Sequence, residues 1–200
     1  MRANGRHSHF APVCFVLLNH LLLVIPADAR RDTYVLKPIV IESDVAMTHG
    51  QLTVHAPKGW FTCNARLGNE IGFRPSTCNG ECPLLSVQVF HLGSSQPRTE
   101  TGQARQYLDG MRRHEDDSVV MEKLRSFSIG GKQAALYHFH SSYIQERLTL
   151  FLLKDDLMVQ IELRGRDFAD IYGRVESLNE VAQMAWSSMR GTGESARGSQ

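Results

Sequence analysis

Residues 119–164 read VVMEKLRSFSIGGKQAALYHFHSSYIQERLTLFLLKDDLMVQIELR, four apolar runs separated by turn-forming residues. Gly130-Gly131 is a turn signal between the first two runs, and Lys154-Asp155-Asp156 is a compact polar turn between the last two. Consecutive strands that are joined by short turns pair antiparallel. The segment therefore predicts a meander of four strands, at residues 119–129, 133–140, 147–153 and 157–164.

Two amphipathic helices are predicted, one before and one after this meander. Thr99 or Thr101 caps the first helix, whose apolar side chains recur at helical spacing as far as Met111. The second helix has an apolar stripe from Val175 to Met189. Strands followed by a helix, repeated once, are typical of segregated α+β domains. We expect an antiparallel sheet flanked by two main helices, in an α/β/α sandwich.

Further strands are predicted before the first helix. Residues 51–56 alternate polar and apolar side chains, which is the period of a half-buried strand. Segments 61–65 and 70–74 flank Leu67-Gly68-Asn69, whose Gly and Asn tolerate positive φ, so they predict a hairpin. Residues 85–89 alternate again and predict another strand.

The N-terminal segment has the three-part order of a secretory signal. Arg2 and Arg6 precede an apolar run at residues 11–25, and Ala27-Asp28-Ala29 provides small residues for cleavage. We expect residues 1–29 to be removed and the protein to be periplasmic or secreted.

Two kinds of membrane attachment are alternatives to a cleaved signal. A spanning helix needs about 20 apolar residues, whereas this run is shorter and contains Asn19 and His20. A lipid on Cys14 is rejected because this cysteine lies near the start of the run rather than at its end. We expect no stable membrane insertion after cleavage.

The rest of the chain predicts a lead-in segment at residues 30–50, a single α+β domain at 51–190 and a disordered polar tail at 191–200. The whole chain has a formal net charge of +1. Loss of Arg2, Arg6 and Asp28 leaves the remainder formally neutral. A neutral domain lacks the basic surface that nucleic acids require, so we expect no nucleic-acid partner.

Three cysteines, Cys63, Cys78 and Cys82, lie beyond the signal. Exported chains tend to pair their thiols. Asn79-Gly80 forms turns readily, so Cys78 and Cys82 are one candidate bridge, and a bridge from Cys63 to either of them is the other. A zinc site would need a second closely spaced pair, so we expect these cysteines to bind no metal.

His138 and His140 are the sharpest candidates for a metal site. Residues two apart on a strand point to the same face, so both imidazoles could converge on one ion, with Glu146 or His91 as a third ligand. The alternative is a pair of solvent-facing histidines on a polar sheet face. We favour that alternative because two ligands rarely suffice for zinc, and we expect no metal and no cofactor.

Sequence motifs for other catalytic or ligand-binding sites are incomplete in this chain. Residues 126–130 do not form a nucleophile elbow, and Gly130-Gly131-Lys132 lacks the remaining residues of a phosphate loop. The acidic runs at 115–117 and 155–156 do not follow the spacing of an EF-hand. Trp60 is expected in the core rather than as an exposed anchor for a partner. We therefore expect no catalytic residues.

Short motifs carry a resemblance to a known family. They are a strand that leads into Pro57-Lys58-Gly59-Trp60, a helix, Ile129-Gly130-Gly131-Lys132-Gln133-Ala134 between two strands, and a C-terminal helix. Over residues 51–189 the pattern resembles the PsbP-like domains of the photosynthetic oxygen-evolving complex and their bacterial envelope relatives, including DcrB-like proteins. The resemblance implies a sheet sandwiched between helices and members that mostly bind or assemble without catalysis. The loop at residues 77–83 is not part of the family pattern.

These features together predict an exported, non-catalytic domain that binds another protein or an envelope component through loops at the sheet edge. One alternative is an immunity protein that blocks an envelope-targeted bacterial toxin, because some exported domains of similar architecture resemble such proteins. The other is a metal-dependent hydrolase that uses His138 and His140.

Overall fold

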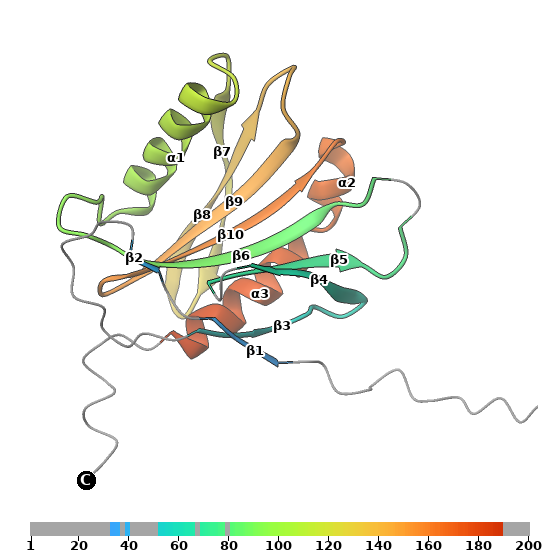
Figure 1. Cartoon of the computed structure of the whole chain (residues 1–200), viewed down its shortest axis with the longest axis horizontal. Coiled ribbons are helices and arrows are strands. Elements are labelled where there is room, and N and C mark those ends of the chain that lie inside the picture. The colour runs from blue at the N-terminus through green and yellow to red at the C-terminus, as the bar shows by residue number, and fades with distance from the viewer. Residues whose placement is uncertain (1–32, 37–38, 41–51, 67–68, 79–80, 190–200) are drawn as a thin grey trace, which may run out of the picture. The chain divides into compact units, whose positions relative to one another are not determined.

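The computed structural model describes residues 33–36, 39–40, 52–66, 69–78 and 81–189, and the statements below refer to these residues. The predicted signal, most of the lead-in segment and the predicted tail lie outside them. The antiparallel α+β class is confirmed by the strands and helices of Figure 1.

Seven antiparallel strands form the main sheet in the order β4-β5-β6-β10-β9-β8-β7. The predicted four-strand meander is its second half, because β7, β8, β9 and β10 pair in succession. A two-residue strand, β2, pairs in parallel with the end of β6, and β1 and β3 form a separate antiparallel pair. The strands are β1 (Thr33–Leu36), β2 (Ile39–Val40), β3 (Leu52–His55), β4 (Trp60–Arg66), β5 (Glu70–Pro75), β6 (Leu84–His91), β7 (Val120–Ile129), β8 (Lys132–His140), β9 (Glu146–Lys154) and β10 (Leu157–Gly165).

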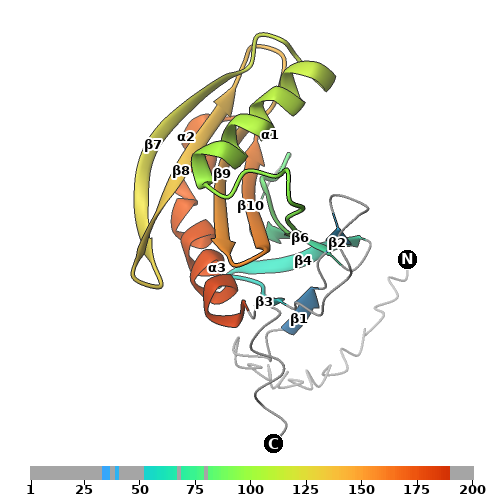
Figure 2. The same cartoon turned by 90° about the vertical axis from the view of Figure 1, so that its left-hand side faces the viewer.

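Three helices cover the two faces of the sheet. Helix α1 (Glu100–His114) packs on β8 and β9 on one face, whereas α2 (Phe168–Gly173) and α3 (Val175–Ser188) pack on the other. Figures 1 and 2 show α1 and α3 on opposite sides of the strands. Thr99 rather than Thr101 caps α1, because its hydroxyl accepts the backbone N–H of Gly102. Helix α2 was not predicted.

Each face of the sheet has its own apolar core. Along β8, Leu136 belongs to the core under α2 and α3, while Tyr137 and Phe139 belong to the core under α1. Phe151 of β9 joins the α1 core, and its neighbour Leu150 joins the other core. Strands that are buried on both faces read as nearly continuous apolar runs, which explains the composition of residues 134–163.

The turn between β7 and β8 fixes the C-terminal helix. Gly130 adopts a φ of 56°, and a Cβ added there would lie 1.6 Å from Nε1 of Trp186 in α3. Only glycine permits both the left-handed backbone and this close approach. The Gly-Gly pair predicted as a plain turn is therefore also a docking point for α3.

Strand β7 contains a bulge that changes which side chains share a face. From Ile129 back to Arg125 the residues pair regularly with β8, but Leu124 is extra, and Lys123 then pairs with Tyr137. An extra residue turns every side chain beyond it to the opposite face. Glu122 is consequently opposite His138, in the place that Lys123 would take in a regular hairpin.

Candidate functional site

Several features meet at one end of the main sheet, which we call the loop end. It comprises the described residues of the disulfide loop (76–78 and 81–83) before β6, the connection at 141–145 between β8 and β9, and α2 after β10. The ion pair between Arg166 Nε and Glu81 Oε2, at 2.8 Å, joins the disulfide loop to the segment before α2. An open hollow of about 380 Å³ is lined by these two residues and by Tyr143.

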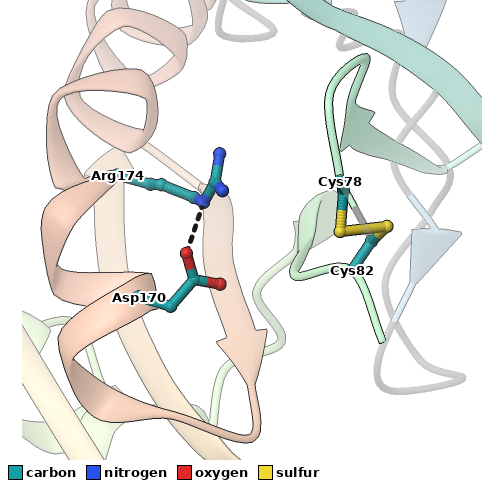
Figure 3. Close-up of a disulfide and its surroundings, with 4 residues drawn as sticks. All are labelled: Cys78, Cys82, Asp170 and Arg174. Carbon is teal, nitrogen blue, oxygen red and sulfur yellow. Dashed lines mark hydrogen bonds and ion pairs between the residues drawn. A yellow bond between two sulfur atoms is a disulfide. The ribbon is translucent and has the colours of Figure 1, made fainter. Parts of the chain in front are cut away.

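The disulfide joins Cys78 and Cys82, which decides between the two pairings left open by the sequence. Their Cα atoms are 5.6 Å apart. Figure 3 draws this disulfide together with the ion pair between Arg174 Nε and Asp170 Oδ1, which are 3.0 Å apart. Cys63 is a free, exposed thiol at a bulge in β4. The bridge therefore closes a short loop and does not staple distant strands.

Two histidines and two carboxylates form a cluster on the α2 face, which we call the histidine cluster. His138 Nε2 lies 2.6 Å from Glu146 Oε2, and His140 Nε2 lies 3.7 Å from Glu122 Oε1. The two imidazoles stack with their centroids 4.5 Å apart. Phe168 of α2 lies against His138, with the ring centroids also 4.5 Å apart. Three strands and α2 thus contribute to the cluster.

The prediction that His138 and His140 share one face of the sheet is confirmed, but the prediction that both face the solvent is wrong for His138. Both rings lie on one face, as two-residue spacing requires, but His138 is only 7% exposed rather than solvent-facing. Phe168, on an unpredicted helix, provides part of this cover. Glu146 lies beside the pair, whereas His91 lies at the opposite end of the sheet, with its Nδ1 3.3 Å from Asp156 Oδ2.

Glu122 was missed by the sequence reasoning. In a regular hairpin with the observed Ile129–Lys132 pairing, Lys123 would be opposite His138 and Glu122 would point to the α1 face. The bulge at Leu124 reverses this assignment. No turn residue or break in residues 120–129 signals the bulge, so the carboxylate could not be found from the pattern.

Apolar side chains are exposed around the same end. Of the five large hydrophobic side chains exposed in the described chain, four lie at the loop end or the adjoining start of β7, and Phe61 is the exception. Tyr143 is the most exposed at 84%. Phe168 and Tyr172 stack on each other along α2 with their centroids 5.4 Å apart. The four are Val120, Tyr143, Phe168 and Tyr172.

A second polar cluster lies on the α1 face, and we call it the arginine cluster. Glu162 is 4% exposed and accepts a hydrogen bond from the Tyr107 hydroxyl. Arg147 Nη1 donates to that hydroxyl at 3.0 Å, and its Nη2 forms an ion pair with Glu115.

Burial of the arginine cluster, together with the charge of Glu162, raises the pKa of Tyr107. Burial alone would lower the pKa of Arg147, but Glu162 and Tyr107 raise it. The charges in this cluster compensate one another.

A groove runs between α1 and the sheet beside the arginine cluster. Its volume is about 340 Å³, and its walls include Tyr107, Met111, Phe151 and Met158 with Gln160 at the sheet. The volume lies at the lower limit for a pocket that holds a small ligand. Its walls are more apolar than those of the two open hollows beside residues 141–146, so the groove is the alternative binding site to the loop end.

The remaining candidates have structural partners. Asp116 accepts hydrogen bonds from Ser141 and Ser118, and the Ser141 hydroxyl holds its pKa below the usual range. Trp60 packs against the core and donates to Ser177 Oγ at 3.0 Å, as expected of a core residue. In the two acidic runs, Glu115 pairs with Arg147, and Asp156 pairs with His91.

Comparison with known proteins finds likeness of structure alone. No family model and no curated sequence matches the chain. The solution structure of PsbP from the cyanobacterium Synechocystis is 14% identical, covers 82% of this chain and 94% of its own, and has a TM-score of 0.46. The Ran-binding protein Mog1p of Saccharomyces cerevisiae is 9% identical, with coverages of 80% and 96% and a TM-score of 0.45.

A third similar structure is LpqN of Mycobacterium tuberculosis, described as involved in cell envelope biogenesis. It is 10% identical and covers 80% of this chain and 91% of its own, with a TM-score of 0.43. PsbP also belongs to the family that the short motifs of this chain resemble. Within the described residues, no helix is long and apolar enough to cross a bilayer.

Proposed function

We propose that this protein is an exported, non-catalytic domain that binds another protein through its loop end. The observation that carries the proposal is the gathering of Val120, Tyr143, Phe168 and Tyr172 in exposed positions around this end. Aromatic side chains are enriched among the residues that dominate binding energy in protein interfaces. Val120 and Tyr143 also line the two open hollows, which leaves them accessible to a partner.

The disulfide loop supports recognition rather than core stability. A bridge between Cys78 and Cys82 restricts only a few residues, and Glu81 of that loop is tied to Arg166. A loop that is already held in one conformation loses less conformational freedom when it binds. The loop lies outside the family pattern, so it is a feature of this chain on which specificity can depend.

Export is part of the proposal and rests on the sequence of residues 1–29. Cell fractionation of the source organism followed by N-terminal sequencing tests it. We expect the protein in the periplasm or medium with Arg30 as its first residue. Recovery of uncleaved chain from the cytoplasm would contradict export.

The binding surface is tested by affinity capture from an envelope extract, with matched variants as bait. We expect Tyr143→Ala/Tyr172→Ala to reduce recovery of the partner at least roughly tenfold, because losing an aromatic anchor typically costs more than about 1.4 kcal/mol. Phe61→Ala is the control, since Phe61 is also exposed but lies on β4. Equal recovery with all three baits would contradict the proposed surface.

Catalysis is the competing function. Turnover of an ester, glycan or peptide substrate by the purified protein, lost in His138→Gln and His140→Gln, would replace the binding proposal with the hydrolase alternative.

A further inference from the structure

The histidine cluster brings three ligand atoms together, with a fourth carboxylate beside them. Those of Glu122, His138 and His140 lie within 4.8 Å of one another. Glu146 is not part of that group, but its Oε2 lies 2.6 Å from His138 Nε2. In a tetrahedral zinc site with bonds of about 2.0–2.1 Å, neighbouring ligand atoms lie roughly 3.3 Å apart. The 3.7 Å between His140 Nε2 and Glu122 Oε1 is close to that value, so small side-chain movements would bring this pair to zinc geometry.

The charges in the cluster also favour a cation. With neutral imidazoles it holds two carboxylates, and their ion-pair partners among the described residues are the two histidines alone, with no Lys or Arg. The bulge at Leu124 keeps Lys123 out of the cluster and brings Glu122 in. A lysine at that point would repel a metal ion, whereas a carboxylate can bind it.

One ligand nitrogen lacks a hydrogen-bond partner. His140 Nε2 is buried from solvent and accepts or donates no hydrogen bond, although Glu122 is nearby. An unsatisfied buried polar atom is costly and calls for a partner. His140 and Glu146 also line an open hollow of about 520 Å³, which provides a route for an ion.

We propose that the histidine cluster binds one divalent ion of the zinc class through the imidazoles of His138 and His140 and the carboxylate of Glu122, with Glu146 orienting His138. Imidazole ligands select zinc, nickel or copper over calcium and magnesium, which prefer oxygen. The Glu146 carboxylate, hydrogen-bonded to His138 Nε2, would fix the orientation of that imidazole. Three protein ligands hold the ion between β7 and β8, and water completes a tetrahedral shell.

Calorimetric titration of the purified full chain with zinc chloride tests the site. Because His7 and His9 form a second His-x-His pair in the sequence, the titration uses the His7→Gln/His9→Gln background. We expect one zinc ion per chain and a higher unfolding temperature with zinc. Glu122→Gln should weaken binding at least roughly tenfold, because it removes a direct ligand and loss of even an outer-shell partner of a ligand costs about that much, and Glu122→Lys should abolish it.

Controls separate this site from other ligands and from loss of fold. Glu122 is more than half exposed, so its variants should keep the circular dichroism of the parent. His114→Gln and Cys63→Ser, which change an exposed histidine and the free thiol, should bind zinc as the parent does. No saturable binding to the parent, or binding that survives Glu122→Lys and His140→Gln, would overturn the site. Neither result bears on partner binding, which the capture experiment tests separately.

Discussion

The arginine cluster and the histidine cluster lie on opposite faces of the sheet and share strand β9, and they differ in how their charges are paired and in their access to solvent. Arg147 and Glu146 are neighbours on β9, yet Arg147 contacts Tyr107 and Glu115 on the α1 face while Glu146 contacts His138 on the α2 face. The arginine cluster pairs each charge with an opposite charge or a hydroxyl. Among the described residues, the two acids of the histidine cluster pair only with histidines, and the cluster has an opening to solvent. Each cluster contains one buried nitrogen without a hydrogen-bond partner, Nε of Arg147 and Nε2 of His140. Because successive side chains of a strand point to opposite faces, one face of the sheet carries the charges that stabilise the fold and the other carries the candidate metal ligands.

The largest expected effect comes from breaking the arginine cluster. Arg147→Met removes the cation that contacts the Tyr107 hydroxyl and Glu115, and it leaves the buried Glu162 carboxylate with the Tyr107 hydroxyl and Arg164, whose Nη1 is 3.9 Å from Glu162 Oε1. We expect the free energy of unfolding to fall by about 3 kcal/mol. Urea unfolding measures this. Arg125→Met is the control, because Arg125 pairs with the exposed Glu176 and its loss should cost less than about 1 kcal/mol. Equal losses of unfolding free energy in Arg147→Met and Arg125→Met would contradict a larger contribution from the arginine cluster.

The next effect concerns the loop end. Cys78→Ser/Cys82→Ser opens a loop of only a few residues, and the chain-entropy relation gives a loss of about 2 kcal/mol for so short a loop. We expect the fold to survive this loss and partner capture to fall, because the loop is no longer held. Undiminished capture by a folded double variant would show that the loop is not part of the binding surface.

Tyr107→Phe tests the arginine cluster through the pH dependence of the free energy of unfolding. The variant loses hydroxyl bonds to Glu162 and Arg147, so we expect about 1.5 kcal/mol of destabilisation near neutral pH. The folded-state pKa of Tyr107 is raised, so its contribution is complete below the tyrosine pKa of the unfolded chain, about 10, and is lost as pH rises above that value. The difference between the parent and Tyr107→Phe should therefore shrink in alkaline urea titrations. A constant difference up to about pH 11 would contradict a raised pKa.

The smallest expected effect is the coupling between the two clusters. If they are independent, zinc should stabilise the parent and Tyr107→Phe by amounts that agree within about 0.5 kcal/mol. Chemical unfolding with and without zinc measures both increments. A larger discrepancy would show that the sheet couples its two faces.

The sequence predicted much of this fold because its main signals are local. The turns at Gly130-Gly131 and Lys154–Asp156, the meander between them and the stripes of α1 and α3 all appear in the structure. Helix α2 was missed because six residues are too few to show a period, although Asp167 carries an N-cap signal. The disulfide could not be assigned because the sequence does not tell which thiol lies in the exposed β4 bulge.

The candidate site was harder to predict because its defining contacts are not local. Two-residue spacing placed His138 and His140 on one face, but their burial depends on Phe168, which lies beyond two further strands. Glu122 joins them only because Leu124 is an extra residue in β7. Neither the helix contact nor the bulge leaves a period or a turn residue in the sequence.

Photocrosslinking in intact cells tests most directly whether the loop end, rather than the groove under α1, is where this protein acts. A crosslinking amino acid replaces Tyr143 in one version and Gln106, an exposed groove residue, in another. We expect a single protein to be crosslinked from position 143 and none from position 106. Crosslinking from position 106 with none from position 143 would contradict the proposed surface and assign binding to the α1 groove.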